Sequence, residues 1–219
     1  MTEVRENCRR ILDRVREAAL QSGRDPQSIR LIAVTKTVPE AKIREAVECG
    51  VSHIAENRLQ EALPKREALR DLALTWHFIG HLQTNKAKKV LENFDWIQSV
   101  DRTELAETLN QAAGRPVPVM IEVKLHDEPA KSGVAETALP RFVEQFRQYE
   151  RLQLRGLMAI PPFCENAEDA RPYFRKLRHF SEQLGLTDLS MGMSHDFQVA
   201  IEEGATMVRI GTALFGERR

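Results

Sequence analysis

A lysine directly after a buried strand is the first feature of this sequence that indicates chemistry. Lys36 follows the apolar run 31–35. Desolvation at the end of a buried strand favours the neutral form of an amine, which is nucleophilic and suited to forming a Schiff base. Lys124 and Lys131 compete on the same argument, and a surface lysine at a strand end is the plainer interpretation of Lys36.

Two segments nearer the C-terminus contain residues suited to holding a phosphate group. Ser194 precedes a predicted helix over 196–203, whose free backbone N–H groups and dipole attract anions. Gly211 and Thr212 follow the neighbouring strand, where a glycine permits close approach of a ligand to the backbone. Each feature alone has a plainer explanation, since Ser194 could cap the helix and Gly211 could form a turn. Together, at adjacent strand ends, they favour a phosphate site.

Arg209 is a further candidate because it lies two residues before Gly211, on the same face of its strand. A guanidinium at such a position needs a partner that balances its charge. A carboxylate such as Glu122 or an atom of a ligand could be that partner, and the sequence leaves both open.

Short apolar strands alternate with helical stretches along the chain, after an amphipathic helix predicted over 3–21. The predicted strands are 31–35, 53–57, 76–80, 96–100, 117–123, 154–160, 189–192 and 207–211. Strands that are apolar on both faces indicate a parallel sheet covered by helices.

Eight strand and helix units in 219 residues predict an α/β protein with a single (β/α)8 TIM barrel and an extra N-terminal helix. No linker divides residues 1–219, so we expect one domain. An open doubly wound sheet is the second choice, although no G-x-G-x-x-G motif follows the first strand. In a barrel, functional residues gather at the C-terminal ends of the strands, which are unusually polar here.

Composition argues against several classes of protein. Lys and Arg number 32 and so do Asp and Glu, which gives no general attraction to nucleic acid or to a membrane. No apolar run approaches the roughly 20 residues of a membrane span, and charges throughout residues 1–20 argue against a secretory signal, so we expect a cytoplasmic protein. Cys8, Cys49 and Cys164 are far apart and odd in number, which indicates neither a disulfide framework nor a metal site.

Seven motifs, in order from about residue 31 onward, resemble those of the pyridoxal phosphate homeostasis proteins. They are Ala33–Lys36, Glu56–Arg58, Trp76–Lys86, Lys131–Gly133, Gly156–Pro161, Ser190–Ser194 and Met207–Thr212. The resemblance implies a barrel like the N-terminal domain of alanine racemase that holds pyridoxal 5'-phosphate (PLP) without known catalysis. It also implies a role in vitamin B6 and amino-acid balance, with no catalytic residue and no metal.

The resemblance further implies a role for each candidate residue. On that pattern Lys36 holds PLP as a Schiff base, Asn57 lies beside the cofactor, Met191 lines the pocket, Arg209 faces the pyridine nitrogen, and Ser194, Gly211 and Thr212 hold the phosphate. A guanidinium keeps its proton at neutral pH, so a pyridine nitrogen opposite it stays unprotonated and the ring is a weaker electron sink.

Two enzymatic alternatives can be weighed against a carrier. A racemase needs two bases, and the only tyrosines, Tyr149 and Tyr173, lie in predicted helices away from the strand ends, so we expect weak racemase-type activity at most. A lysine-dependent aldolase would use Lys36 or Lys124 but leaves the position of Arg209 unexplained. The expected partners are PLP and apo PLP enzymes that receive it, and we expect a monomer.

Overall fold

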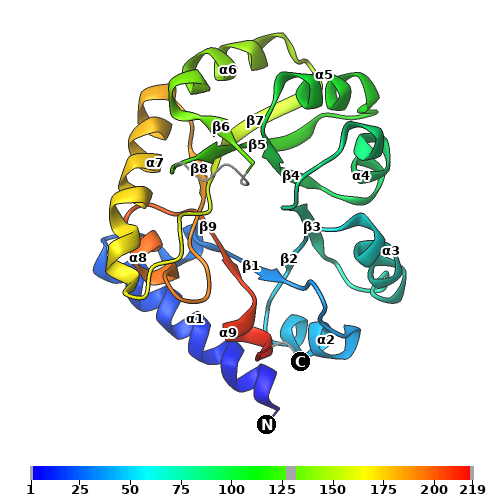
Figure 1. Cartoon of the computed structure of the whole chain (residues 1–219). Helices are drawn as coiled ribbons and strands as arrows, with labels where there is room; N and C mark the ends of the chain where they lie inside the picture. Colours follow the sequence, from blue (N-terminus) through cyan, green and yellow to red (C-terminus); the bar gives the residue numbers. More distant parts are fainter. Residues whose placement is uncertain (1, 127–131, 218–219) are drawn as a thin grey trace.

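The computed structural model describes residues 2–126 and 132–217, whose strands form a closed barrel. Its parallel strands are, in ring order, β1 (Arg30–Val34), β2 (His53–Glu56), β3 (Thr75–Phe78), β4 (Trp96–Val100), β5 (Val117–Lys124), β7 (Leu152–Met158), β8 (Asp188–Ser190) and β9 (Met207–Ile210). The pairings β4–β5 and β1–β9 close the ring, which Figure 1 shows end on. The predicted (β/α)8 fold is confirmed, and the open sheet is excluded.

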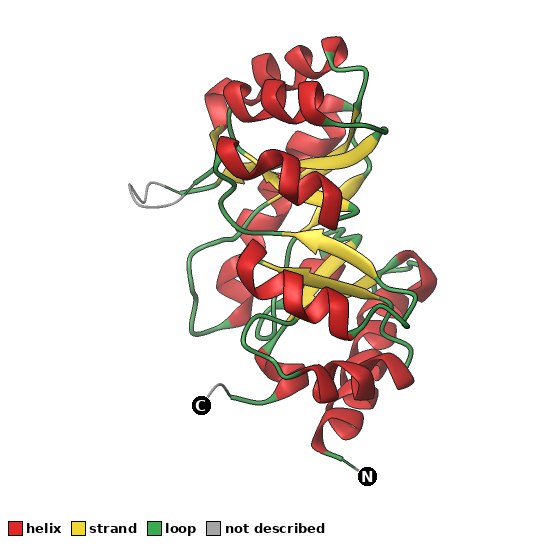
Figure 2. Ribbon diagram, turned by 90° about the vertical axis from the view of Figure 1, so that its right-hand side faces the viewer, coloured by secondary structure: helices red, strands yellow, loops and turns green. Residues whose placement is uncertain are grey.

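Helices surround the strands on the outside, as Figure 2 shows from the side. They are α1 (Glu3–Gln21), α2 (Glu40–Glu48), α3 (Leu59–Ala68), α4 (Ala87–Asn93), α5 (Thr103–Ala112), α6 (Leu139–Gln145), α7 (Arg171–Leu184), α8 (Phe197–Glu202) and α9 (Thr212–Phe215). The helices α6 and α7 begin later than predicted, each with a proline at its second position, Pro140 and Pro172. Proline suits the first turn of a helix because the N–H group it lacks has no partner there.

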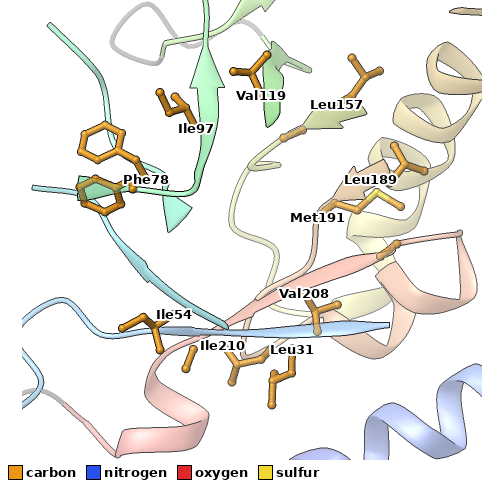
Figure 3. Packing of buried hydrophobic residues seen from close by; sticks show 14 of the residues in the cluster. Leu31, Ile54, Phe78, Ile97, Val119, Leu157, Leu189, Met191, Val208 and Ile210 are labelled. Atoms are coloured by element: carbon orange, nitrogen blue, oxygen red, sulfur yellow. The ribbon is translucent and has the colours of Figure 1, made fainter. Parts of the chain in front are cut away.

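The strands are buried on both faces, which explains their apolar sequences. Residues facing outward pack against the helices, and Figure 3 shows several of them, including Leu31, Ile54 and Val208. A smaller apolar cluster fills the interior of the barrel and consists of Ile32, Val34, Ala55, Met120, Met158 and Met207. The interior is therefore a packed core, and a ligand can reach only its rim.

The predicted N-terminal helix is confirmed as α1, which packs against α2, α8 and α9. Its buried stripe consists of Val4, Cys8, Ile11, Val15, Ala18 and Ala19. Asn7 of α1 donates a hydrogen bond to the carbonyl oxygen of Leu214 (3.2 Å), and Lys42 Nζ of α2 donates one to that of Phe215 (2.9 Å). Because a short helix leaves its last carbonyls without internal partners, these bonds stabilise α9.

Two short elements were not predicted. The strand β6 (Val134–Ala135) extends the edge of β5, and α9 begins directly after β9. Within the described ranges, no helix has the length and apolar character required to cross a bilayer, and no three His, Cys, Asp or Glu side chains are grouped as metal ligands. Cys8, Cys49 and Cys164 are free thiols.

Candidate functional site

The candidate residues come together at the C-terminal rim of the barrel. Lys36 follows β1 by two residues and is half-buried, and Asn57 follows β2 directly. Gly80, two residues after β3, lies close against the end of β2. A Cβ atom on Gly80 would lie 2.1 Å from the carbonyl oxygen of Asn57. Only glycine permits this approach, so the residue type at position 80 allows the ends of β2 and β3 to lie close together.

The turn after Lys36 has an unusual backbone. Thr37 adopts a φ of +62°, in the left-handed region that β-branched residues rarely occupy. Its N–H group donates to Glu61 Oε2 (3.3 Å), a contact between this turn and α3. Strain of this kind persists only where the surroundings hold the backbone in place, so the position of Lys36 is set by more than its own strand.

A buried ion pair contacts the residue before Lys36, and this pair was not identified from the sequence. Lys65 Nζ of α3 donates to Glu56 Oε1 (2.7 Å) and to the carbonyl oxygen of Thr35 (2.5 Å). The hydroxyl of Thr35 donates to the same carboxylate oxygen (2.8 Å). The sequence did contain a signal, because Lys65 lies in the apolar stripe of α3, three residues after the buried Ala62. These bonds tie the end of β1 to the end of β2.

The structure brings Ser194, Gly211 and Thr212 together. The N–H groups of Gly211 and Ala213 both donate to Ser194 Oγ, at 3.3 and 3.2 Å, and Thr212 begins α9 between them. Two amides on either side of one residue that converge on a single oxygen atom form a concave set of donors, an arrangement of the kind that can bind anions.

The predicted anion site at the start of the helix over 196–203 stays a prediction. The N–H groups of Asp196 and Phe197 donate to the carbonyl oxygen of Met193, just as those of Gly211 and Ala213 donate to Ser194 Oγ. The buried carboxylate of Asp196 itself accepts from Met193 N (2.7 Å) at the start of α8.

Arg209 is buried near the same rim. Its Nη1 donates to Ser190 Oγ (2.8 Å) and its Nη2 donates to the carbonyl oxygen of Ala159 (2.9 Å). Burial lowers the pKa of Arg209 to about 10, against the attraction of Asp196 and Glu122, so the group is still a cation at neutral pH. Glu122 is the partner that the sequence suggested. Among the described contacts it forms no hydrogen bond with Arg209, and it attracts the guanidinium only through its charge.

Glu122 is a second titratable group at this rim, near the end of β5. Burial and, to a lesser degree, repulsion by Asp101 raise the pKa of Glu122 to about 7, while Arg209 acts in the opposite direction. The folded protein therefore binds this proton more tightly than the unfolded chain, where the carboxyl titrates near 4.5. The contribution of Glu122 to stability is present at low pH and is lost as the pH rises through about 7.

We expect the substitution Glu122→Gln to remove that pH dependence. Between about pH 5 and about pH 8, the wild-type free energy of unfolding should fall by about 2 to 3 kcal/mol more than that of the variant. Urea unfolding of the PLP-free protein at both pH values measures this. The exposed Glu150→Gln is the control and should behave as wild type. Parallel curves for wild type and Glu122→Gln would contradict the prediction.

Other candidate residues have mixed outcomes. Met191 is fully buried in the main apolar cluster beside Leu189 (Figure 3), so the structure does not bring its side chain to the surface of the site. Lys124 ends β5 and is half-buried. Lys131 lies outside the described residues.

Tyr173 lies on α7, with its ring centroid 6.4 Å from that of His126, which follows β5 by two residues. The prediction that both tyrosines lie away from the strand ends is therefore wrong for Tyr173.

The fold and these residues define a class of protein: a (β/α)8 barrel with a lysine after its first strand and, after its last strand, two amides that converge on a serine hydroxyl. A family model described as "Alanine racemase, N-terminal domain" matches residues 4–219. Two relatives named "Pyridoxal phosphate homeostasis protein" align over nearly the whole length of both chains. The one from Aquifex aeolicus is 47% identical (98% of each chain), and the one from Escherichia coli is 39% identical (100% of this chain, 98% of the relative).

Solved structures agree with this assignment. PipY of Synechococcus elongatus with PLP bound is 44% identical, with a TM-score of 0.83 over 94% of this chain and 100% of that one. An alanine racemase from Clostridium difficile shares the fold, with a TM-score of 0.73 at 15% identity over 97% of this chain and 57% of the racemase. This chain belongs to the pyridoxal phosphate homeostasis proteins, within the alanine racemase N-terminal domain family. The resemblance seen in its motifs is confirmed.

Proposed function

We propose that this protein binds PLP and serves PLP and amino-acid homeostasis, with residues 1–219 acting as a single domain. The observation that carries the proposal is the presence of three complementary groups at one barrel rim: the amine of Lys36, the amides around Ser194, and the buried cation of Arg209. PLP has a matching aldehyde, phosphate and ring nitrogen. PipY, a solved relative, carries PLP.

Lys36 is the residue that we propose attaches the cofactor. The neutral Nζ adds to the aldehyde carbon of PLP, a C=N bond replaces the C=O bond, and the aldehyde oxygen leaves as water. The strained turn at Thr37 and the buried Lys65–Glu56 pair hold the backbone on either side of this lysine. These contacts hold the backbone around Lys36 without taking part in the bond.

Around the rest of the cofactor, we propose that Ser194, Gly211 and Thr212 bind the phosphate. Asn57 Oδ1 is buried and lacks a hydrogen-bond partner among the described residues, as expected for an acceptor that a ligand satisfies. Arg209 is proposed to donate to the pyridine nitrogen, which then stays unprotonated and leaves the ring a weak electron sink. That arrangement favours storage of PLP over carbanion chemistry.

The same features support a carrier rather than an enzyme. The relatives are named for homeostasis, and the residue proposed opposite the pyridine nitrogen weakens the chemistry that a racemase needs. Tyr173 is the one tyrosine near a strand end, so a weak racemase-type activity is the second candidate and Tyr173 its candidate base. Amino-acid turnover at an ordinary enzymatic rate would overturn the carrier proposal. We also propose a cytoplasmic monomer that passes PLP to apo enzymes.

Visible absorbance of the purified protein, followed by borohydride reduction and peptide mapping, tests the proposal directly. We expect a yellow protein whose reduced label maps to Lys36. A colourless protein that takes up no added PLP would overturn the proposal and favour an aldolase that uses Lys36 or Lys124. A label on Lys124 would overturn the assignment of the lysine while retaining the cofactor.

The phosphate site gives a further expected result. The double substitution Ser194→Ala/Thr212→Val removes two hydroxyl groups and the acceptor for the Gly211 and Ala213 amides. We expect a rise in the Kd for PLP of about tenfold to a hundredfold, because hydrogen bonds to charged groups contribute about 1.5 to 3 kcal/mol. Fluorescence titration measures it. The same exchanges at exposed positions, Ser52→Ala/Thr137→Val, are the control. Equal affinity of both double variants would refute the assignment.

A further inference from the structure

A row of polar side chains crosses the interior of the barrel, from the C-terminal rim to the N-terminal rim. Its hydrogen bonds are Arg209 Nη1 to Ser190 Oγ (2.8 Å), Ser190 Oγ to Gln98 Oε1 (2.7 Å), Gln98 Nε2 to His77 Nδ1 (2.9 Å), and His77 Nε2 to His53 Nδ1 (3.0 Å). The first four side chains are buried, and His53, the first residue of β2, is half-buried. No role assigned above uses the three residues between Arg209 and His53.

Arg209 fixes the direction in which these bonds donate. A guanidinium has only donors, so Ser190 Oγ accepts from it and gives its own proton to Gln98 Oε1. The amide nitrogen of Gln98 then faces His77, and because that nitrogen is also only a donor, His77 Nδ1 must accept.

The same logic extends to the far end of the row. Burial holds the pKa of His77 well below its ordinary value, so the ring is neutral and carries one proton. Since Nδ1 accepts, that proton lies on Nε2, which donates to His53 Nδ1. Burial also lowers the pKa of His53, and its neutral ring accepts this bond. Every bond in the row therefore donates away from Arg209.

The surroundings make this direction the only favourable one. Met207 Sδ lies 3.5 Å from Gln98 Nε2, and Met120 and Met158 belong to the same interior cluster. Reversing the Gln98 amide alone would turn its oxygen toward His77 Nδ1 and Met207 Sδ, both acceptors here, and an unsatisfied buried polar group costs about 1 to 3 kcal/mol. Buried networks of this kind specify a single arrangement of their members when every group is satisfied.

We propose that Ser190, Gln98 and His77 are positioning residues that fix the guanidinium of Arg209 for the ring nitrogen of PLP. The proposal rests on the proposed function for the role of Arg209. Two of the five N–H groups of the guanidinium are held by Ser190 Oγ and the carbonyl of Ala159, which fixes its plane. Ser190 Oγ can accept from Arg209 because its own proton is donated to Gln98 Oε1. His77 in turn holds the Gln98 amide in the orientation that accepts this proton.

The direction of donation can be tested in the PLP-free protein by ¹⁵N NMR of its histidines. In the wild type we expect the His77 ring to carry its proton on Nε2, with Nδ1 unprotonated. In Gln98→Glu, the carboxylate at this position can only accept, so we expect a proton on His77 Nδ1. The exposed Gln153→Glu on β7 is the matched control and should leave His77 unchanged. A wild-type His77 with its proton on Nδ1 would overturn the proposal.

The positioning role is tested in the PLP-loaded protein with Ser190→Ala, a smaller side chain that the core can accommodate. We expect a shift of the ¹⁵N resonance of the pyridine nitrogen, an altered visible absorbance, and about a tenfold weaker affinity for PLP. Ser190→Thr retains the hydroxyl and should restore all three. If Ser190→Ala leaves the pyridine resonance unchanged, the positioning role is wrong. If the wild type takes up no PLP, the proposed function fails, whereas the histidine measurement still decides the direction of the row.

Discussion

Replacing Lys36 by alanine is expected to abolish covalent retention of PLP. The variant has no primary amine at the end of β1, so no C=N bond to the cofactor can form there. Borohydride incorporation should fall to background and the yellow colour should be lost on gel filtration. The residues proposed to bind the phosphate and the ring follow other strands, and weak reversible binding of PLP through them should persist.

Two variants make this result specific to the amine. Lys36→Arg keeps a cation at the position, yet a guanidinium stays protonated and is not a nucleophile, so it should also retain no label. Lys124→Ala removes the other described lysine at a strand end and should label as wild type. Full labelling of Lys36→Ala would show that another lysine attaches the cofactor.

The substitution Lys65→Met should cause the largest loss of stability among the changes considered. It leaves the fully buried carboxylate of Glu56 without its ammonium partner, and the carbonyl oxygen of Thr35 keeps only the bond from Val38 N. Removing one member of a buried ion pair typically costs about 3 to 5 kcal/mol. For a chain of this length, that corresponds to a fall in Tm of about 10 °C.

Calorimetry and urea unfolding of the PLP-free protein measure this loss. The same exchange at an exposed position of α4, Lys89→Met, is the control and should change the free energy of unfolding by less than about 0.5 kcal/mol. The double variant Lys65→Met/Glu56→Gln removes both charges and should recover part of the stability. If Lys65→Met is no less stable than Lys89→Met, the ion pair does not stabilise the rim.

The fold could be predicted from the sequence because most residues of the barrel strands are buried, on both faces of the sheet, and leave apolar runs. Such runs are visible without knowledge of what packs against them. By contrast, β6 has two residues and α9 has four, which is too short for any periodicity to appear. The starts of α6 and α7 were missed because their first residues form tighter 3₁₀ turns.

The site was predictable to the extent that topology determines it. Parallel strands bring their C-terminal ends to one rim, so Lys36, Asn57, Arg209 and Gly211 had to come near one another. The identity of hydrogen-bond partners depends on side-chain positions, which the sequence does not fix. It left the partner of Arg209 open, and the structure shows a bond to Ser190. It also did not indicate that the amides of Gly211 and Ala213 face Ser194. The polar row through the interior joins residues from five strands and has no local pattern.

The bond between Asn7 and the carbonyl of Leu214 joins residues 207 positions apart. During synthesis, α1 leaves the ribosome early, and its contacts with α9 can form only after nearly the whole chain has been synthesised. The amides proposed to hold the phosphate lie at the start of α9, and β9 must also pair with β1 to close the ring. The nascent chain therefore contains Lys36 long before the proposed phosphate site can form, and we expect it to retain PLP only once the barrel is complete.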